Sequence, residues 1–477
     1  MGGFFVMVNT AYGHKLVITH KQCNNMVMTK LSTQSYKGSR DYYPEDKRIQ
    51  NYIFSKWHTV AQRHGYMEYG APLLEPIEVY TAKSGQELAG EQTYLFTDRG
   101  GREVAIRPEM TPTISRMVAA RRQELSYPAR LYSIANFMRY ERPQRGRERE
   151  FWQFNADLFG VQGVVADAEI ITLAYDSVKI FGAQNDDFVI KINHRSLIDT
   201  IMRGYLGLTR EYAQRMIKLL DRKNKIPADS FREQANDILA DAGVSGHAKK
   251  LERILQARKI ADLPSSVREH FSAHELQELF KQLHAAGVSN AQFDMTLMRG
   301  LDYYTGVVFE VMDNAPENNR SMFGGGRYDG LVGLFGVEPV ATVGMAPGLS
   351  PMQLFLETHG LLPELPPTID ISVLVLAREA LPGALTLARQ LREEGVRVEV
   401  DITCRKLDKQ LKAALKKKTP YIIFVGEDEI KQGQYTLKNT ATEHEERVSV
   451  ERIIATVRDR RHQQAATDEL DELMMLD

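Results

Sequence analysis

A short basic segment between two apolar runs concentrates the side chains best suited to binding a phosphate. Arginine and glutamate are interleaved in it, the residues being Arg139, Glu141, Arg142, Arg145, Arg147, Glu148, Arg149 and Glu150. Guanidinium groups are planar and always charged, so they can bind two oxygens of a phosphate at once. Mixed arginine and glutamate loops are more often surface ion-pair networks than binding sites. The composition therefore predicts either an anion-binding loop or a solvated one.

The run directly after this segment has one polar face. Within residues 151–159, Gln153, Asn155 and Asp157 alternate with apolar side chains. Because successive side chains of a β-strand point to opposite faces, these three polar groups would share one face. The run 130–138 predicts a second strand, so the pair would form a hairpin whose loop holds the arginines. A polar face can simply be washed by solvent, but the neighbouring arginines favour a binding site.

The segment 107–113 ends a predicted strand and opens a helix that we expect to begin near Thr113. It contains Glu109 and Thr111. The Glu109 carboxylate could bind a substrate ammonium group. Both residues could instead only cap the helix, because such side chains often accept hydrogen bonds from the first backbone N–H groups. The two roles are compatible.

Two glycine-bearing segments follow. Residues 299–306 combine a cation, an acid, two aromatic rings and two glycines ahead of a predicted strand at 307–312. Such density is unusual for a turn in a core. The glycines at 324–326 could hold a ligand through their backbone, but they lack the Gly-Lys-Ser/Thr ending of a phosphate-binding P-loop. As a pattern alone they favour a simple hairpin turn.

These segments need a scaffold to bring them together. An amphipathic pattern predicts a helix over 48–62, followed by strand-like residues in 65–75. Residues 200–290 are helical in pattern, with breaks at Pro227, Gly243, Pro264 and Gly287. Strand character returns at 307–312. We therefore expect an all-helical insertion within a core that is built on a sheet.

The proline-rich stretch 363–367 predicts a linker, because the pattern changes behind it. Short apolar strands then alternate with helices, the expected strands being 371–376, 397–400 and 421–425 and the expected helices 379–394 and 406–418. This order predicts a small parallel α/β domain. A basic face on the second helix could be solvated or could follow RNA phosphates. Its residues are Lys406, Lys409, Lys412, Lys416, Lys417 and Lys418.

Bulk properties narrow the class of protein. A chain of 477 residues is long enough for two or three domains. Its net charge of -1 means that any RNA would have to be bound by local basic patches. Cys23 and Cys404 offer neither a disulfide framework nor a zinc spacing, which fits a reducing compartment. No apolar run approaches the ~20 residues that span a bilayer, so we expect no membrane partner.

The two ends of the chain differ in charge. Residues 1–40 contain five basic residues and no acid, which partly resembles an organelle transit peptide. A flexible extension over 1–35, or a working start at Met26 or Met28, fits equally well. The last ten residues carry five acids and no base, which predicts a solvated tail.

Five segments together resemble the histidyl-tRNA synthetases, a family of class II aminoacyl-tRNA synthetases. They are the opening residues 38–44, the dimer motif 65–75 around Pro72, the second class motif from Arg139 to Pro143, and two signatures at 299–306 and 324–331. The similarity runs from Gly38 to about Arg460. The signature 299–306 is the most specific, because it is similar to histidine enzymes rather than to class II enzymes in general.

The resemblance implies an α+β catalytic domain with an antiparallel sheet, a helical insertion and a C-terminal α/β anticodon-binding domain. The expected division is an extension at 1–35, a catalytic core at 36–200 and 293–360, an insertion at 201–292, a linker at 361–369, an anticodon-binding domain at 370–462 and an acidic tail at 463–477. It also implies a homodimer, and a cytoplasmic location.

The resemblance further implies activation of L-histidine by ATP, with transfer of histidine to tRNA(His). ATP would enter with Mg²⁺ as a substrate, and no metal site of the protein's own is implied. Arg139 and Arg299 would be catalytic, and with Arg147 they would bind ATP. The histidine-binding set comprises Glu109, Thr111, Gln153 and Asp157, which match positions that hold the ammonium group, and Tyr303, Tyr304 and Tyr328, the last two matching positions at the imidazole. Gln144 and Arg149 resemble positions near the tRNA acceptor end.

Two positions depart from the family pattern. Asp157 stands where many bacterial members carry glutamate, which keeps the charge. The third class motif reads Gly-Leu-Ser-Pro at 348–351, where Gly-Leu-Glu-Arg is usual. Losing that arginine would remove a charge-assisted contact worth about 1.5–3 kcal/mol. The departure leaves open a catalytically silent relative, such as the synthetase-like regulatory subunit of histidine biosynthesis. The signature 299–306 argues against a synthetase for proline, threonine or glycine.

Overall fold

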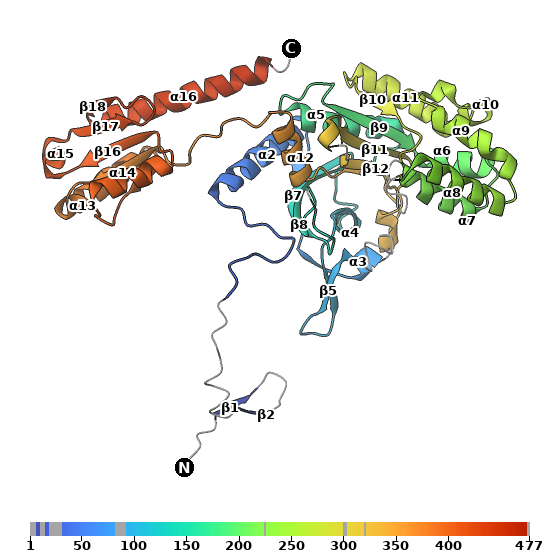
Figure 1. The fold of residues 1–477 in the computed structure, drawn as a ribbon, viewed down its shortest axis with the longest axis horizontal. Helices are drawn as coiled ribbons and strands as arrows, with labels where there is room; N and C mark the ends of the chain where they lie inside the picture. The colour runs from blue at the N-terminus through green and yellow to red at the C-terminus, as the bar shows by residue number, and fades with distance from the viewer. Residues whose placement is uncertain are drawn as a thin grey trace.

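The computed structural model describes residues 6–9, 15–18, 31–81, 92–144, 146–223, 226–298, 303–318 and 321–474. Figure 1 shows a central sheet covered by helices, a group of helices beside it and a C-terminal unit joined by an irregular segment. Near the N-terminus, β1 (Val6–Asn9) and β2 (Lys15–Ile18) form an antiparallel pair. The flexibility expected of 1–35 mostly concerns residues outside the described ranges and stays a prediction.

The central sheet has eight strands in the order β10-β9-β11-β12-β13-β8-β7-β3. Their bounds are β3 Met67–Glu68, β7 Ala129–Met138, β8 Glu150–Phe159, β9 Phe188–His194, β10 Ala291–Phe293, β11 Val307–Asp313, β12 Ser321–Arg327 and β13 Thr342–Met345. Neighbours are antiparallel except at the two ends, where β3 runs parallel to β7 and β10 parallel to β9. The antiparallel sheet and the hairpin of β7 and β8 are thus confirmed.

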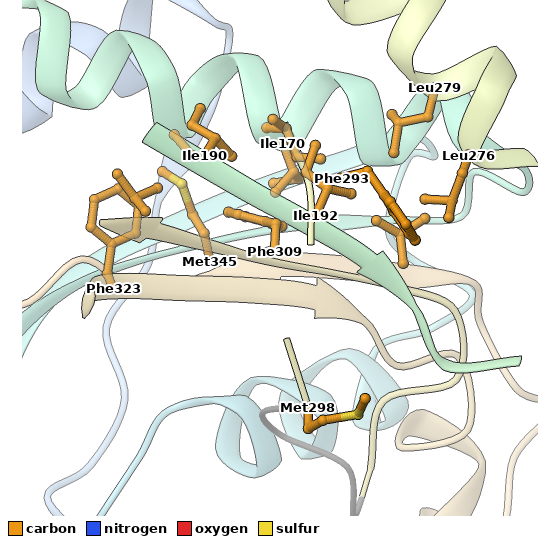
Figure 2. Close-up of a cluster of buried hydrophobic side chains, with 14 of the residues drawn as sticks. Ile170, Ile190, Ile192, Leu276, Leu279, Phe293, Met298, Phe309, Phe323 and Met345 are labelled. Carbon is orange, nitrogen blue, oxygen red and sulfur yellow. The ribbon is translucent and has the colours of Figure 1, made fainter. Parts of the chain in front are cut away.

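One face of this sheet packs against helices. Figure 2 shows Ile190, Ile192 and Phe309 of the sheet beneath Ile170 and Leu276 of two helices, all of them buried. Trp57 stacks on Phe154 of β8, with their ring centroids 5.6 Å apart. The helices on this face are α2 (Pro44–Arg63), α5 (Val164–Lys179), α11 (Phe271–Ala285) and α12 (Leu349–Thr358). The opposite face carries polar side chains of β8 and β9, among them Gln153, Asn155 and Lys191.

Between β9 and β10 the described residues form helices but no strand. They are α6 (Arg195–Asp199), the π-helix η2 (Thr200–Tyr205), α7 (Arg210–Asp221), α8 (Ala228–Asp241), η4 (Ser245–His247), α9 (Ala248–Gln256), η5 (Ile260–Asp262), α10 (Ser265–Arg268) and α11. Pro227 and Pro264 are the N-caps of α8 and α10. Proline lacks a backbone N–H and favours extended backbone before a helix, so these predicted breaks are confirmed.

A smaller sheet is formed by strands that precede β7 in the chain. It has the order β4-β6-β5, with β4 at Leu74–Pro76, β5 at Tyr94–Thr97 and β6 at Glu103–Ile106. The short helix α3 (Glu78–Thr81) follows β4, and α4 (Thr111–Ala120) follows β6. Helix α4 begins two residues before the predicted start at Thr113.

The C-terminal unit is a five-stranded sheet in the order β15-β14-β16-β17-β18. Its elements are β14 Ile371–Val375, α13 Leu381–Glu393, β15 Val398–Val400, α14 Leu407–Lys416, β16 Tyr421–Val425, α15 Glu427–Gln432, β17 Tyr435–Asn439, β18 Glu445–Val448 and α16 Val450–Met474. The three predicted strands β14, β15 and β16 pair in parallel as expected, and the unpredicted strands β17 and β18 extend the sheet in antiparallel pairing. The backbone of α16 also runs through most of the expected acidic tail.

None of the helices in the described ranges is long and apolar enough to cross a membrane. The boundaries expected for the domains are not tested by these elements and stay a prediction.

A buried ion pair ties the sheet to α5. Arg327 of β12 donates to Asp167 at 2.7 Å, and their side chains are only 10% and 1% exposed. Arg327 also donates to the backbone oxygens of Gly163 and Val161. Burial raises the pKa of Asp167 to about 6, although the Arg327 guanidinium counteracts this. The ionised form of the Asp167 carboxylate therefore depends on the guanidinium of Arg327.

We predict that Arg327→Met lowers the free energy of unfolding by about 3–5 kcal/mol, because it leaves Asp167 buried without a cation. Adding Asp167→Leu should restore part of the loss, since no charge is then stranded. Urea denaturation of the three proteins measures both effects. The control is Arg389→Met, whose exposed pair with Glu393 should contribute less than about 1 kcal/mol. Equal losses in Arg327→Met and the control would contradict the role of burial.

Candidate active site

A cavity of about 1010 Å³ opens on the polar face of the central sheet. It is lined by nine of the predicted site residues, namely Glu109, Thr111, Arg139, Gln144, Arg147, Gln153, Tyr303, Tyr304 and Tyr328. They come from the start of α4, the β7–β8 hairpin, the segment before β11 and the end of β12. The volume is large enough for a ligand of nucleotide size together with an amino acid.

Of the other three predicted site residues, two lie elsewhere and one is outside the described residues. Arg299 is outside the described residues, as are its neighbours up to 302, and so is Arg145 of the hairpin loop. Asp157 lies beneath the cavity rather than on its wall, at 3% exposure. Arg149 lines a different cavity of about 390 Å³ with Lys37 and Tyr140.

Arg139 is fixed at the point where β7 leaves the sheet. Its Nε donates to the backbone oxygen of Pro108 at 2.8 Å, and its guanidinium lies over the Phe151 ring at 5.2 Å. Its ion-pair contact with Glu141 is long, at 4.0 Å. The side chain is therefore oriented mainly through Nε and the flat face of the guanidinium. In this orientation a terminal nitrogen of the Arg139 guanidinium can bind an anion in the cavity.

Arg149 instead makes its contacts with other residues of the protein, away from the large cavity. Its Nε donates to the Glu141 carbonyl at 3.1 Å, its Nη1 donates to the Tyr36 hydroxyl at 3.2 Å, and its guanidinium lies over the Tyr140 ring. Its backbone N–H donates to the carbonyl of Gly38. Arg149 thus holds the residues before α2 against the base of the hairpin. Sequence alternation alone could not predict that it turns away from the large cavity.

Glu109 is buried and lies directly before α4. The N-cap of α4 is Met110, and no side-chain capping hydrogen bond is formed there. The capping role of Glu109 and Thr111 stays a prediction beside their role as binding residues. Both residues line the cavity beside Gln153 and Asn155 of β8. A carboxylate, a hydroxyl and two amides thus share one wall, which suits the binding of an ammonium group.

Beneath this wall, Tyr328 donates its hydroxyl proton to Oδ1 of Asp157. No hydrogen-bond partner is present for Oδ2 of Asp157 among the described residues, although that atom is buried. Burial raises the pKa of Asp157 to about 7, and the hydrogen bond from Tyr328 only partly offsets it. Burial and the nearby Asp157 carboxylate also raise the pKa of Tyr328. The pair therefore keeps the proton on the tyrosine and presents its hydroxyl oxygen as an acceptor.

Glycines make room on this face of the sheet. A Cβ at Gly326 would lie 2.7 Å from the Val307 carbonyl and 3.0 Å from the Tyr304 ring, and one at Gly344 would overlap the Asp157 carboxylate. The prediction of a hairpin turn at 324–326 is wrong, because these residues lie within β12. Their conformation is ordinary strand, so the glycines are required by close approach rather than by an unusual backbone angle.

Two aromatic residues close the cavity opposite the strands. The rings of Tyr303 and Tyr304 are tilted with centroids 4.7 Å apart, and Tyr303 meets Tyr328 edge to face at 6.0 Å. Burial raises the pKa of Tyr303, with smaller contributions from Tyr304 and Glu109. The Tyr303 hydroxyl therefore stays protonated and can take part in hydrogen bonds with a bound ring.

The altered third motif also lies at the cavity. Ser350 and Pro351 line it at the start of α12. The Ser350 hydroxyl donates to Oε2 of Glu148 at 3.2 Å. Burial raises the pKa of Glu148, while this hydrogen bond and Arg40 lower it. Ser350 therefore binds an acid of the hairpin from the position of the usual glutamate, and Pro351 stands where the usual motif has an arginine.

Sequence reasoning missed the far end of the cavity. Lys191 of β9, Glu310 of β11 and Asp294 line it there. Lys191 and Glu310 are register partners, and Lys191 pairs with Asp294 at 3.0 Å. The available signal was a lysine in the middle of the apolar strand 188–194, where one side chain must face away from the core.

Comparison with known proteins agrees with this geometry. A family model described as "Histidyl-tRNA synthetase" matches residues 38–352, and one described as "Anticodon binding domain" matches residues 370–460. The chain is 41% identical over 419 residues to a histidine–tRNA ligase of Leptospira biflexa, covering 87% of this chain and 95% of that one. It is 38% identical over 411 residues to the histidine–tRNA ligase of Haloarcula marismortui, covering 85% and 93%.

Solved structures share the fold. The histidyl-tRNA synthetase of Nostoc sp. PCC 7120 matches with a TM-score of 0.75 at 24% identity, over 90% of this chain and all of the other. A Bacillus halodurans protein titled as an ATP phosphoribosyltransferase regulatory subunit/histidyl-tRNA synthetase matches with a TM-score of 0.68 at 24% identity, over 83% of this chain and 98% of the other. On the match of residues 38–352 and the identity to these ligases, the chain belongs to the histidyl-tRNA synthetase family.

Proposed function

We propose that this chain activates L-histidine with ATP, forming histidyl-adenylate and pyrophosphate, and then transfers the histidine to tRNA(His). The proposal rests on one observation: a single cavity is lined by Arg139, Glu109, Gln153 and Tyr328. These residues offer a fixed cation for a phosphate, an acid for an ammonium group and a polar site for a ring. The family membership and the anticodon-binding match support the same reaction.

In the first step the histidine carboxylate attacks the α-phosphorus of ATP, the bond to pyrophosphate breaks, and negative charge builds on the phosphate oxygens. Arg139 stabilises that charge, because its Nε is held by Pro108 and its guanidinium cannot swing away. Arg147 binds ATP from the exposed end of the hairpin. Arg299 is the second catalytic cation. Mg²⁺ enters as part of the ATP complex.

Histidine lies with its ammonium group toward Glu109, Thr111 and Gln153 and its imidazole toward the tyrosines. The structure supports a change in the role of Asp157, which the resemblance placed at the ammonium group. Because Asp157 accepts the Tyr328 proton, it acts as a positioning residue that turns the Tyr328 hydroxyl oxygen toward an imidazole N–H. An analogue without that N–H leaves a buried polar group unpaired, which is a strong basis for discrimination.

For the second step, the tRNA acceptor end enters beside Gln144, which lines the cavity. Arg149 supports this entrance by holding the hairpin base. The basic face of α14 contacts RNA phosphate in the C-terminal unit. The enzyme works in the cytoplasm, which subcellular fractionation of the tagged chain would test. A regulatory subunit has less support, because this chain carries the anticodon-binding match at 370–460.

We predict ATP/pyrophosphate exchange that depends on L-histidine and not on proline or threonine. Arg139→Ala should slow this exchange by about a hundredfold or more, because removing one fixed donor to a developing charge typically costs about 10²–10³ in rate. The measurement is incorporation of labelled pyrophosphate into ATP.

The matched control is Arg142→Ala, since Arg142 lies in the same hairpin but is exposed and does not line the large cavity. It should keep near-parental exchange. Similar rates for Arg139→Ala and Arg142→Ala would contradict the role of the hairpin. Exchange with proline or threonine but not with histidine would contradict the specificity.

We predict opposite effects of Asp157→Asn on stability and on binding. Because burial raises the pKa of Asp157 to about 7 from 3.8, the folded chain keeps a proton that the unfolded chain releases. The parent should therefore lose stability relative to the variant as the pH rises from 4 to 7, reaching a deficit of about 1–3 kcal/mol. Histidine affinity should fall at least tenfold, measured by calorimetry. A stability difference that stays constant from pH 4 to 8 would contradict the assignment.

We propose that the chain is a homodimer joined beside β3 and the small sheet, where Met67, Leu74 and Phe96 are 64%, 45% and 45% exposed. Such a group of exposed apolar side chains marks an interface. Leu74→Glu with Phe96→Glu should weaken dimerisation at least tenfold in sedimentation velocity. Leu415→Glu, at a similarly exposed position, should not. A parent chain that sediments as a monomer would overturn the proposal.

A further inference from the structure

A second cavity of about 670 Å³ lies beside the first, between the end of β10 and the helical insertion. Lys191, Asp294 and Thr296 line both cavities. The wall between the two cavities thus contains the ion pair of Lys191 and Asp294, on the polar face of the sheet. The volume is within the range of cavities that bind a ligand of nucleotide size.

The lining divides into an apolar part and a cationic part. The apolar residues include Leu255, Ala257, Ile260, Phe280, Phe293 and Met295, and the cationic residues are Lys191, Lys223, Arg258 and Lys259. Asp294 is the one carboxylate among the described residues that line the cavity. A surface of this kind matches a ligand with a flat apolar ring at one end and an anion at the other.

The acids near this cavity already have partners. Asp294 accepts hydrogen bonds from the backbone N–H and the hydroxyl of Thr296, and it pairs with Lys191. Burial alone would raise the pKa of Asp294, but these partners hold it below its usual value. The nearby Asp262 carboxylate accepts the backbone N–H groups of Arg258 and Lys259. These acids therefore offset only part of the positive charge at the cavity, and the remaining cations form no direct ion pair with them in the described part of the chain.

Those remaining cations are Lys223, Arg258 and Lys259. In the described part of the chain, no acidic oxygen forms a salt bridge within 4.0 Å of their side-chain nitrogens. Lys223 is half-buried, and burial together with Arg258 lowers its pKa, although Asp294 partly opposes this. Lys223 is partly buried and Arg258 and Lys259 are exposed, and an external anion would relieve the repulsion among these cations. A phosphate is the anion that best matches several closely spaced lysine and arginine donors.

We propose that this second cavity binds a nucleotide, with its phosphate at Lys223, Arg258 and Lys259 and its base on the apolar floor beside Phe280. The ligand is either a free nucleotide or the terminal nucleotide of an RNA strand whose other end reaches the first cavity. Because Lys191 lies in the shared wall, a phosphate here competes with Asp294 for that lysine. The proposal concerns a second site and does not depend on histidine activation.

Calorimetric titration of the full chain with AMP tests this site. The parent should bind two AMP per chain, and Lys223→Ala with Arg258→Ala should bind one, with the second affinity weakened at least tenfold. The matched control is Lys218→Ala with Arg253→Ala, which removes the same charge from exposed positions of α7 and α9 outside both cavities. Adenosine, which lacks the phosphate, should not bind at the second site.

A tRNA titration separates the two sources of the nucleotide. If an RNA end occupies the cavity, the Lys223/Arg258 variant should bind tRNA at least tenfold more weakly than the control, and tRNA should displace the second AMP. If a free nucleotide occupies it, tRNA affinity should be the same in both variants. Thermal unfolding checks that each variant is folded, and Lys223→Gln provides a milder change. One AMP bound by the parent, with the same isotherm for the variant and the control, would overturn the proposal.

Arg139→Ala separates this inference from the proposed reaction. It should remove the other AMP, the one bound in the large cavity, and leave the second site intact. A chain that shows no exchange but loses one of two AMP sites in the Lys223/Arg258 variant would reject the reaction and keep the second site.

Discussion

The structure depends on the separation of apolar and polar side chains onto the two faces of one sheet. In β8, Phe154 packs against the helices, while Gln153 and Asn155 face the cavity. A slip of one residue in the pairing would move every side chain to the other face. The ten-residue ladder between β7 and β8 and the buried Arg327–Asp167 pair oppose such a slip. The register that buries the core is thus the register that builds the site.

The separation of polar and apolar side chains also explains why the site contains features that reduce stability. Asp157 has a raised pKa and a buried oxygen with no hydrogen-bond partner in the part of the chain that the structure describes, and positions 326 and 344 are glycines. Each reduces stability relative to an apolar, well-filled strand. Together they place an acceptor oxygen on Tyr328 at the bottom of an open cavity. The family membership explains this arrangement, because a binding site for an amino acid needs both polar groups and space.

Features set by local sequence could be predicted, whereas features set by neighbours could not. The alternation of 151–159 and the helix breaks at Pro227 and Pro264 are local, and the structure confirms them. The glycines 324–326 were assigned to a turn, because only the adjacent strands reveal how closely they approach. Likewise, the hairpin sequence gave no sign that Arg149 stacks on Tyr140. The antiparallel β17 and β18 depend on long-range pairing that short apolar runs do not encode.

A crystal structure of the chain with L-histidine and a non-hydrolysable ATP analogue tests the central claim most directly. The account predicts both ligands on the polar face of the sheet, with the histidine ammonium group at Glu109, the imidazole at Tyr328 and the α-phosphate at Arg139. Ligands bound on another surface, or a histidine whose ring points away from Tyr328, would contradict it.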